Sequence, residues 1–276
     1  MTKKKQMKVS VVIPVFNQCH LTERCLTSLL KNSSGLQGVC VVDNASQDNT
    51  GAILEGFQAS FASAGVSFEI IHNSKNEGFG RACNQGIRHF RKGNAQFIVI
   101  LNNDTWLMPK WDQSLLTVMV EQHLDCIGPY YYEKEFQESM ESMASEFVKA
   151  NHTRLRQHFV PILMCFSRDA IDKLATDCEG SRGGIFDERF FVTYEDADLL
   201  HRMKLLHLSY AQTGSCFIWH QSKGTRSQQS LPTGYEQEGL RLFLEKWGFD
   251  PRPHRESFLI RLHRKYWKWL EKHGKF

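Results

Sequence analysis

The sequence predicts an α/β fold, in which a mostly parallel β-sheet is flanked by helices on both faces. Short apolar segments of strand length alternate with segments whose apolar residues recur at helical spacing. The apolar segments are continuous, as in strands that are buried on both faces of a parallel sheet. With right-handed crossovers, this alternation gives a Rossmann-like arrangement.

The first hundred residues carry the regular part of this pattern. Strands are expected at residues 9–14, 39–42, 66–71 and 96–101. The first two helices between them are recognised by one apolar face each, formed by Leu21, Cys25, Leu26, Leu29 and Leu30, and then by Ile53, Leu54, Phe57 and Phe61. A third helix is expected at residues 78–90.

The second half is less regular. Residues 133–151 are charged and rich in Met, and we expect them to form one helix and a loop. Strands are expected at 159–166 and, as two short ones, around Tyr210 and at 216–219. A turn is expected at Gly183 and Gly184, and a helix at 194–206 with Leu199, Leu200, Met203 and Leu206 facing inward.

Composition narrows the class of protein. A chain of 276 residues can form one large domain with an appendage. No apolar run reaches the about 20 residues that span a bilayer, and we expect no secretory signal. The eight cysteines include no C-x-x-C pair, which argues against a disulfide framework or a zinc site and favours the reducing cytoplasm.

Polar loops follow each of the first four expected strands, at residues 14–17, 43–46, 73–80 and 102–104. In a parallel sheet the carboxyl ends of strands lie side by side, so these loops should meet at one crevice. Asp43 can accept hydrogen bonds from a base or a ribose. Gly78 and Gly80 allow a ligand to approach the backbone and open a helix whose N-terminus favours anions, and Arg81 adds positive charge.

The last of these loops, Asn102-Asn103-Asp104, contains one carboxylate. Mg²⁺ and Mn²⁺ prefer oxygen ligands and are often held by one or two carboxylates plus the phosphates of a substrate. The loop therefore predicts a nucleotide-diphosphate site, although an ordinary exit from a strand uses the same residue types. Dinucleotide binding is disfavoured, because no G-x-G-x-x-G follows the first strand.

Six ordered motifs strengthen this prediction. They are the strand and loop at 9–17, D-N-A-S-Q-D-N-T at 43–50, N-E-G-F-G-R-A-C-N-Q-G at 76–86, L-N-N-D at 101–104, F-D-E-R-F-F at 186–191, and E-D-A-D-L at 195–199. Together they resemble the motifs of family-two glycosyltransferases of the GT-A fold, close to a rhamnosyltransferase-like subgroup. The resemblance covers about residues 8–225.

The resemblance implies an inverting enzyme that moves a hexosyl or deoxyhexosyl group from a UDP- or dTDP-sugar to an acceptor hydroxyl. The acceptor, a saccharide or a lipid-linked sugar, would belong to polysaccharide, lipopolysaccharide or glycoconjugate synthesis. Residues 1–250 would form the GT-A domain, with a nucleotide-binding half at 8–105 and an acceptor and catalytic half at 106–250. The implied donor-binding residues are Pro14, Phe16, Asn17, Asp43, Asn44, Asn76, Gly78, Arg81, Asn102 and Asn103.

The resemblance also implies a divalent metal, Mn²⁺ or Mg²⁺. Asp104 occupies the last acid of the family's D-x-D motif, and Asn102 replaces the first acid, which leaves fewer charged ligands. His220 falls where related enzymes place a metal-binding histidine. Lys223 and Arg226, farther along the same loop, would close over the diphosphate.

Asp196 falls at the position of the family's catalytic base, which takes the proton of the acceptor hydroxyl as the anomeric carbon is attacked in line. Glu195 points about 100° away from it on a helix, so we expect it to position the acceptor. Asp198 is expected to cap the helix or to pair with Arg202. An acidic first helical turn, favoured by the helix dipole, is the alternative for the whole group.

Residues 251–276 are expected to form a basic amphipathic helix with Leu259, Leu262, Tyr266 and Trp269 on one face. Such a helix can lie on an anionic membrane surface, which would place the protein at the inner face of the cell membrane. It can equally pack on the domain or on a second subunit in an oligomer. Nucleic-acid binding is disfavoured, since no recognised motif accompanies the charge.

Two other functions stay open. A nucleotidyltransferase that acts on sugar phosphates shares this fold, but it usually needs a Gly-rich basic loop after the first strand, and the chain has none there. A non-catalytic sugar-nucleotide-binding or assembly subunit would have no need to keep both Asp104 and Asp196.

Overall fold

The computed structural model describes residues 7–133, 136, 140–221 and 233–252. The expected tail helix therefore lies outside the described residues from position 253 onward, as do Lys223 and Arg226. No helix in the described ranges is long and apolar enough to cross a membrane.

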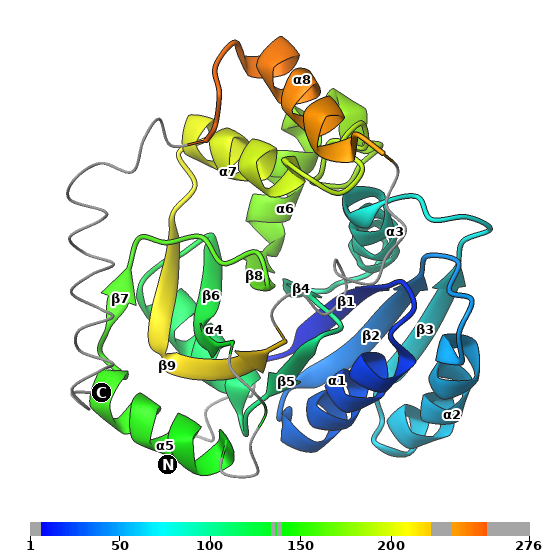
Figure 1. The fold of residues 1–276 in the computed structure, drawn as a ribbon. Coiled ribbons are helices and arrows are strands. Elements are labelled where there is room, and N and C mark those ends of the chain that lie inside the picture. Colours follow the sequence, from blue (N-terminus) through cyan, green and yellow to red (C-terminus); the bar gives the residue numbers. More distant parts are fainter. Residues whose placement is uncertain (1–6, 134–135, 137–139, 222–232, 253–276) are drawn as a thin grey trace.

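The strands and helices follow one another as drawn in Figure 1. In chain order they are β1 (Val9–Val15), α1 (Cys19–Asn32), β2 (Leu36–Asp43), α2 (Thr50–Ser63), β3 (Ser67–His72), α3 (Phe79–Arg91), β4 (Phe97–Leu101), β5 (Thr105–Leu107), α4 (Trp111–Glu121), β6 (Cys126–Tyr132), α5 (Met140–Asn151), β7 (Leu155–Arg156), β8 (Leu163–Ser167), α6 (Arg168–Asp177), the 3₁₀ turn η1 (Glu179–Ser181), α7 (Glu195–Leu205), β9 (Tyr210–His220) and α8 (Tyr235–Trp247).

One sheet contains all the described strands, in the order β3-β2-β1-β4-β8-β6-β9-β5, with β7 paired to β9. The first four strands of this order run parallel, as the alternation of strands and helices predicts. β8 is antiparallel to both β4 and β6, whereas β9 is parallel to β6. The parallel half is thus a Rossmann-like sheet, and the second half extends it with strands of mixed direction.

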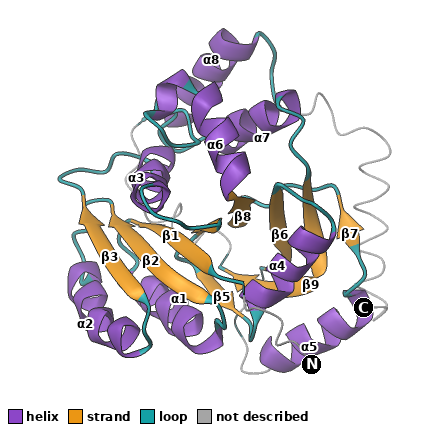
Figure 2. Cartoon of the chain, turned by 180° about the vertical axis from the view of Figure 1, so that it is seen from behind, coloured by secondary structure: helices purple, strands orange, loops and turns teal. Residues whose placement is uncertain are grey.

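Each face of the parallel strands is covered by its own helices. Alternate side chains of β1 divide between the faces, so that Val11 and Ile13 pack with α1, α2 and α4, whereas Val12 packs with α3, α6 and α7. Figure 2 shows the same layers from behind. Gly86 permits the close packing of α3 on β1, because a Cβ at this position would lie 2.4 Å from a methyl group of Val12.

The predictions for the first half are confirmed, while the second half differs in three respects. The two short strands expected near Tyr210 and at 216–219 are one strand, β9, which pairs with β6 on both sides of Gly214 and Ser215, where the register shifts. The strand expected at 159–166 begins only at Leu163. Five elements between residues 105 and 177, namely β5, α4, β6, β7 and α6, were not predicted, and neither were η1 and α8.

Candidate active site

The carboxyl ends of β1, β2 and β4 meet at one edge of the sheet, as predicted. β1 lies between β2 and β4, and its last residue, Val15, pairs with Asp43 at the end of β2. Beyond β1, Asn17 accepts a hydrogen bond at Oδ1 from the backbone of Gln47 (2.7 Å), which ties the first loop to the second. Pro14 is the sixth residue of β1, and Phe16 follows the strand directly.

Asp43 is the buried carboxylate of this edge, with 6% of its surface exposed. Its Oδ1 accepts a hydrogen bond from the backbone N–H of Ser46 at 2.9 Å, and its Oδ2 lies 3.3 Å from Nδ1 of His72. His72 ends β3 and was not among the predicted site residues. Its imidazole is mostly exposed, so it is available to a ligand that reaches Asp43.

Asn44 has a different role from its predicted one. Its Oδ1 accepts hydrogen bonds from the backbone of Glu77 and from the Asn73 amide, both at 2.9 Å. Its Nδ2 donates to Oδ1 of Asn76 (2.8 Å) and to the carbonyl of Gly78 (3.2 Å). A primary amide has two donors and two acceptor sites, so this side chain is saturated inside the protein. Asn44 therefore shapes the loop at 73–78.

The N-terminus of α3 is covered by the chain around Phe191. The backbone N–H of Phe79 donates to the Phe191 carbonyl at 2.9 Å. A Cβ on Gly78, whose φ is +89°, would lie 2.2 Å from that same oxygen. The close approach that we predicted for a ligand at this glycine is thus made by the protein itself.

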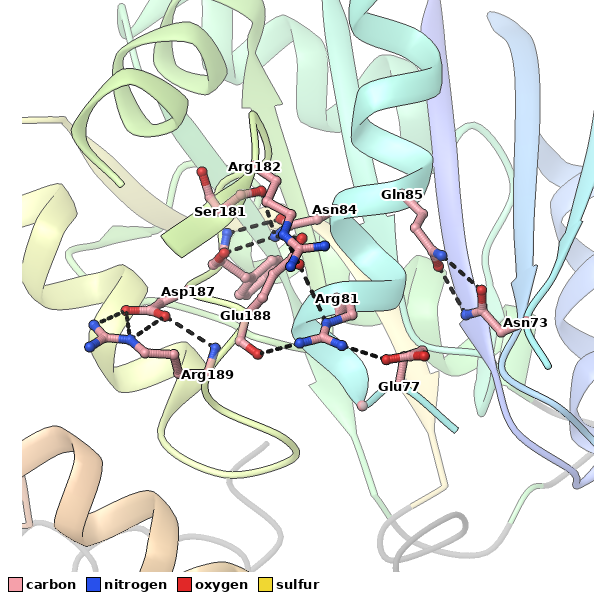
Figure 3. Close-up of polar contacts among 12 residues, drawn as sticks. Asn73, Glu77, Arg81, Asn84, Gln85, Ser181, Arg182, Asp187, Glu188 and Arg189 are labelled. Atoms are coloured by element: carbon pink, nitrogen blue, oxygen red, sulfur yellow. Dashed lines mark hydrogen bonds and ion pairs between the residues drawn. The ribbon is translucent and has the colours of Figure 1, made fainter. Parts of the chain in front are cut away.

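Arg81 lies between two carboxylates, Glu77 on its own helix and Glu188 on the segment that precedes α7 (Figure 3). Glu188 also pairs with Arg88 at 2.9 Å. The predicted positive charge near the crevice is therefore balanced within the protein. Asn84, which we did not single out, holds the same segment, because its Oδ1 accepts from the backbone of Ile185 and Phe186 at 2.9 and 3.0 Å.

The last strand end, after β4, brings Asp104 next to His220. β5 and β9 are antiparallel and place Thr105 opposite His220, and Nε2 of the imidazole lies 3.3 Å from Oδ1 of Asp104. On the other side of the ring, Nδ1 lies 2.9 Å from Oε1 of Glu133. Burial alone would lower the pKa of His220, but the two carboxylates raise it above its usual value.

These residues fit a metal site that a substrate must complete. Within the described ranges, no group of three or more His, Cys, Asp or Glu side chains could hold a metal ion by itself. The buried oxygens Oδ1 of Asn102 and Oδ1 of Asp104 nevertheless accept no well-aligned hydrogen bond. Asn103 points elsewhere, since its Nδ2 donates to Thr22 Oγ1 at 3.0 Å. One carboxylate and one imidazole suit Mn²⁺, with phosphate oxygens as the remaining ligands.

The first turn of α7 presents its acids in different directions. Asp196, the second residue of the helix, is half-buried, and its Oδ1 accepts from the backbone N–H of Ala197 at 2.8 Å. It forms no ion pair with any described residue. Glu195 is buried, with its Cβ near Gly80 at the start of α3. Asp196 is therefore the acid of this pair that is accessible to an acceptor.

Asp198 belongs to a buried charge network that joins α7 to α8. It pairs with Arg202 at 2.9 Å, as predicted, and with Nζ of Lys246 at 2.6 Å. Lys246 also lies 2.8 Å from Asp187, and Trp247 donates its indole N–H to Asp198 at 2.9 Å. Since Asp198 is fully buried, this network holds α7 in place against α8.

Replacing Lys246 by methionine is expected to lower the free energy of unfolding by about 3–5 kcal/mol, because two buried carboxylates lose their shared cation. Urea denaturation of Lys246→Met measures this. Lys204→Met, an exposed lysine on α7, is the control and should change stability by less than about 0.5 kcal/mol. Equal unfolding midpoints for the two variants would show that the network does not stabilise the fold.

The same network predicts a loss of stability in acid. Burial alone would raise the pKa of Asp187, but hydrogen bonds from Arg189 and Lys246 hold it well below its usual value. A carboxylate with a depressed pKa stabilises the fold above its unfolded pKa of about 3.9, and that contribution is lost as the pH falls further. The difference in the free energy of unfolding between wild type and Lys246→Met should therefore become smaller below about pH 4.

Comparisons with known proteins agree with this geometry. The putative glycosyltransferase EpsH of Bacillus subtilis is 26% identical over 156 residues, which are 56% of this chain and 42% of EpsH. An uncharacterised glycosyltransferase of Mycoplasma pneumoniae, the MG060 homolog, is 31% identical over 124 residues, or 44% of this chain and 40% of that protein. The chain thus spans less than half the length of these relatives.

Among solved structures, the mannosyltransferase PcManGT of Pyrobaculum calidifontis in complex with GDP-Man and Mn²⁺ is similar, with a TM-score of 0.58 and 16% identity over 88% of this chain and 65% of that one. TarS 1–349 of S. aureus in complex with UDP-GlcNAc has a TM-score of 0.58 and 17% identity, covering 87% and 66%. At this identity the likeness shows the shared GT-A arrangement of a mostly parallel sheet flanked by helices.

The match to a protein family covers more of the chain than the matches to these two relatives. Residues 10–174 match the family described as Glycosyl transferase family 2. The matched range includes all four strands of the parallel half and the loops at their carboxyl ends. Because it covers more than half of the sequence, the chain belongs to glycosyl transferase family 2.

Proposed function

We propose that the chain is a metal-dependent, inverting glycosyltransferase that moves a hexosyl or deoxyhexosyl group from a UDP- or dTDP-sugar to an acceptor hydroxyl. One observation carries the proposal. Asp43 and Asp104 lie at the same edge of the sheet, and the segment that leads into Asp196 is fastened to α3 next to that edge. Donor groups and a candidate base therefore belong to one rigid framework.

The donor would lie along the carboxyl ends of β1, β2 and β4. Asp43 and the backbone around Pro14, Phe16 and Asn17 would bind the base and ribose. Asn102 and Asn103 would lie beside the diphosphate. Asn44, Asn76, Gly78 and Arg81, whose side chains or backbone contact the protein itself, would act on the donor by holding the loop at 73–81.

Asp104 and His220 would hold Mn²⁺ or Mg²⁺. The solved structure of PcManGT, which shares the fold, is a complex with GDP-Man and Mn²⁺. When bound, the metal would neutralise the charge that develops on the diphosphate leaving group. Oδ1 of Asp104 is buried, and its one polar neighbour among the described residues is Nε2 of His220 at 3.3 Å, which supports their joint assignment to the metal.

Asp196 would take the proton of the acceptor hydroxyl. It stands free of ion pairs among the described residues, and a carboxylate that is not held by a cation can accept a proton more readily. Glu195 would support the acceptor side from its buried position against α3. Displacement in line, with one base and no covalent intermediate, inverts the anomeric carbon.

The acceptor is proposed by class. A saccharide or lipid-linked acceptor in polysaccharide, lipopolysaccharide or glycoconjugate synthesis suits the family, and a rhamnosyltransferase-like activity would use a deoxyhexosyl donor. A cytoplasmic protein bound to the inner face of the membrane through the basic tail would meet a lipid-linked acceptor there.

A panel of nucleotide sugars in the presence of Mn²⁺ tests the proposal in two ways. Thermal unfolding measures donor binding, and release of nucleoside diphosphate is measured with methanol added to accept the sugar. The correct donor at 100 times its Kd should stabilise the folded state by about 2.7 kcal/mol. Protection together with release supports the transferase, whereas protection without release favours a non-catalytic binder. Protection by a nucleoside triphosphate with a sugar phosphate, and by no nucleotide sugar, would favour a nucleotidyltransferase.

A further inference from the structure

His220 lies between two carboxylates that come from different parts of the chain. Its Nε2 is 3.3 Å from Asp104, and its Nδ1 is 2.9 Å from Glu133. The pairing of the strands produces this arrangement. β6 and β9 run parallel with Tyr132 opposite Trp219, so the next residue on each chain, Glu133 and His220, are level with each other.

The contact with Glu133 determines which nitrogen faces the proposed metal. An imidazole can coordinate a metal through one nitrogen while the other donates its proton to a neighbouring acceptor. With a metal beside Asp104, Nδ1–H would donate to Oε1 of Glu133, 2.9 Å away, and the lone pair of Nε2, on the side of Asp104, would be left for the metal. Metal-binding histidines commonly have such a carboxylate behind them, and it fixes the ring and raises the basicity of the ligand.

The ring is further confined by its surroundings. Tyr131 packs edge-on against it, with ring centroids 6.3 Å apart and planes at 86°. Only 12% of the imidazole is exposed. Glu133 pairs with no Lys or Arg among the described residues, so its carboxylate is committed to His220.

We infer that Glu133 is a positioning residue for the metal site, acting by orienting His220 toward Asp104. This inference rests on the proposed metal role of Asp104 and His220 and adds to it a residue outside every motif of the sequence. Glu133 itself does not touch the donor or the metal. An ordinary exposed ion pair would contribute little to stability and nothing to metal binding.

Binding of Mn²⁺ in the presence of saturating UDP, which supplies the phosphate ligands, tests the inference. It is measured by electron paramagnetic resonance of the free ion and corrected for the Mn²⁺ that UDP binds without protein. Glu133→Ala should raise the Kd for Mn²⁺ about 10- to 100-fold, with an unchanged unfolding midpoint in urea. Glu133→Gln keeps an acceptor for Nδ1–H and should recover part of the affinity. Glu141→Ala removes another exposed carboxylate with a single ion-pair partner, Lys31, and should bind Mn²⁺ like wild type.

The outcomes separate this inference from the proposed function. If wild type binds Mn²⁺ and Glu133→Ala binds it equally well, the positioning role is overturned and the metal site stands. If wild type binds no Mn²⁺, the metal role of Asp104 and His220 fails, and the role of Glu133 fails with it. Equal losses of Mn²⁺ affinity in Glu133→Ala and Glu141→Ala would also overturn the inference, since they would show an effect of the net negative charge of the protein.

Discussion

Asp196→Asn is expected to lower the rate of sugar transfer by about 10²- to 10⁴-fold, the usual contribution of a general base. The amide keeps the size of the carboxylate and can still accept from the N–H of Ala197, so α7 should keep its structure. Donor affinity should stay within about twofold, because the change removes only the ability to accept a proton. Transfer rate and donor Kd are measured on the same preparation.

A matched control exists in the neighbouring helix. Asp169 is the second residue of α6, as Asp196 is of α7, and it is exposed. Asp169→Asn removes the same charge from the first turn of a helix and should leave transfer unchanged. Turnover of Asp196→Asn near that of Asp169→Asn would mean that the acids of α7 serve the helix dipole and that the base lies elsewhere.

Asp104→Ala is expected to weaken donor binding about 10- to 100-fold when Mn²⁺ is present, and to abolish measurable transfer. The reason is that the only carboxylate of the Asn102-Asn103-Asp104 loop is lost, which leaves His220 as the one ionisable ligand. With excess chelator, wild type and variant should bind the donor equally weakly. Calorimetric titration with the donor, with and without Mn²⁺, measures all four affinities.

The chelator arm provides the decisive comparison for the metal. Wild-type enzyme that transfers at its full rate in excess chelator would contradict the metal roles of Asp104 and His220. A loss of donor affinity in Asp104→Ala that is equally large with and without Mn²⁺ would assign the residue to the donor directly. His220→Ala should reproduce the metal-dependent part of the loss.

The sequence predicts the parallel half of the fold well, because the dominant signal there is local. Continuous apolar runs such as 97–101 are expected where a parallel sheet is buried between two helical layers. Polar residues begin where these strands leave the sheet. The meeting of Asp43 and Asp104 then follows from topology alone, since parallel strands end at one edge.

What the sequence does not reveal is set by contacts between distant residues. His72 meets Asp43 across 29 positions, Glu133 meets His220 across 87, and Asn84 meets Phe186 across 102. Contacts between residues so far apart in the sequence leave no periodic pattern from which they could be predicted. The strand β9 shows the same limit. Its central Gly214 and Ser215 are poor strand formers, and the two segments on either side of them belong to one strand because β6 pairs with both.

Gly78 illustrates how a correct motif can carry an incomplete interpretation. The motif at 76–86 predicts a close backbone approach at the start of a helix, and the structure has one. The approaching group is the carbonyl of Phe191, so the glycine lets the segment before α7 pack against the start of α3. A glycine that admits a ligand and one that admits another backbone segment look identical in sequence.

The central claim is that one carboxylate, Asp196, activates the acceptor for a single in-line displacement on the nucleotide sugar. The configuration of the first product tests it most directly. Transfer to methanol, followed by ¹H NMR, gives a methyl glycoside that cannot mutarotate. The account predicts a product whose anomeric configuration is opposite to that of the donor. A product that retains the configuration of the donor would contradict it.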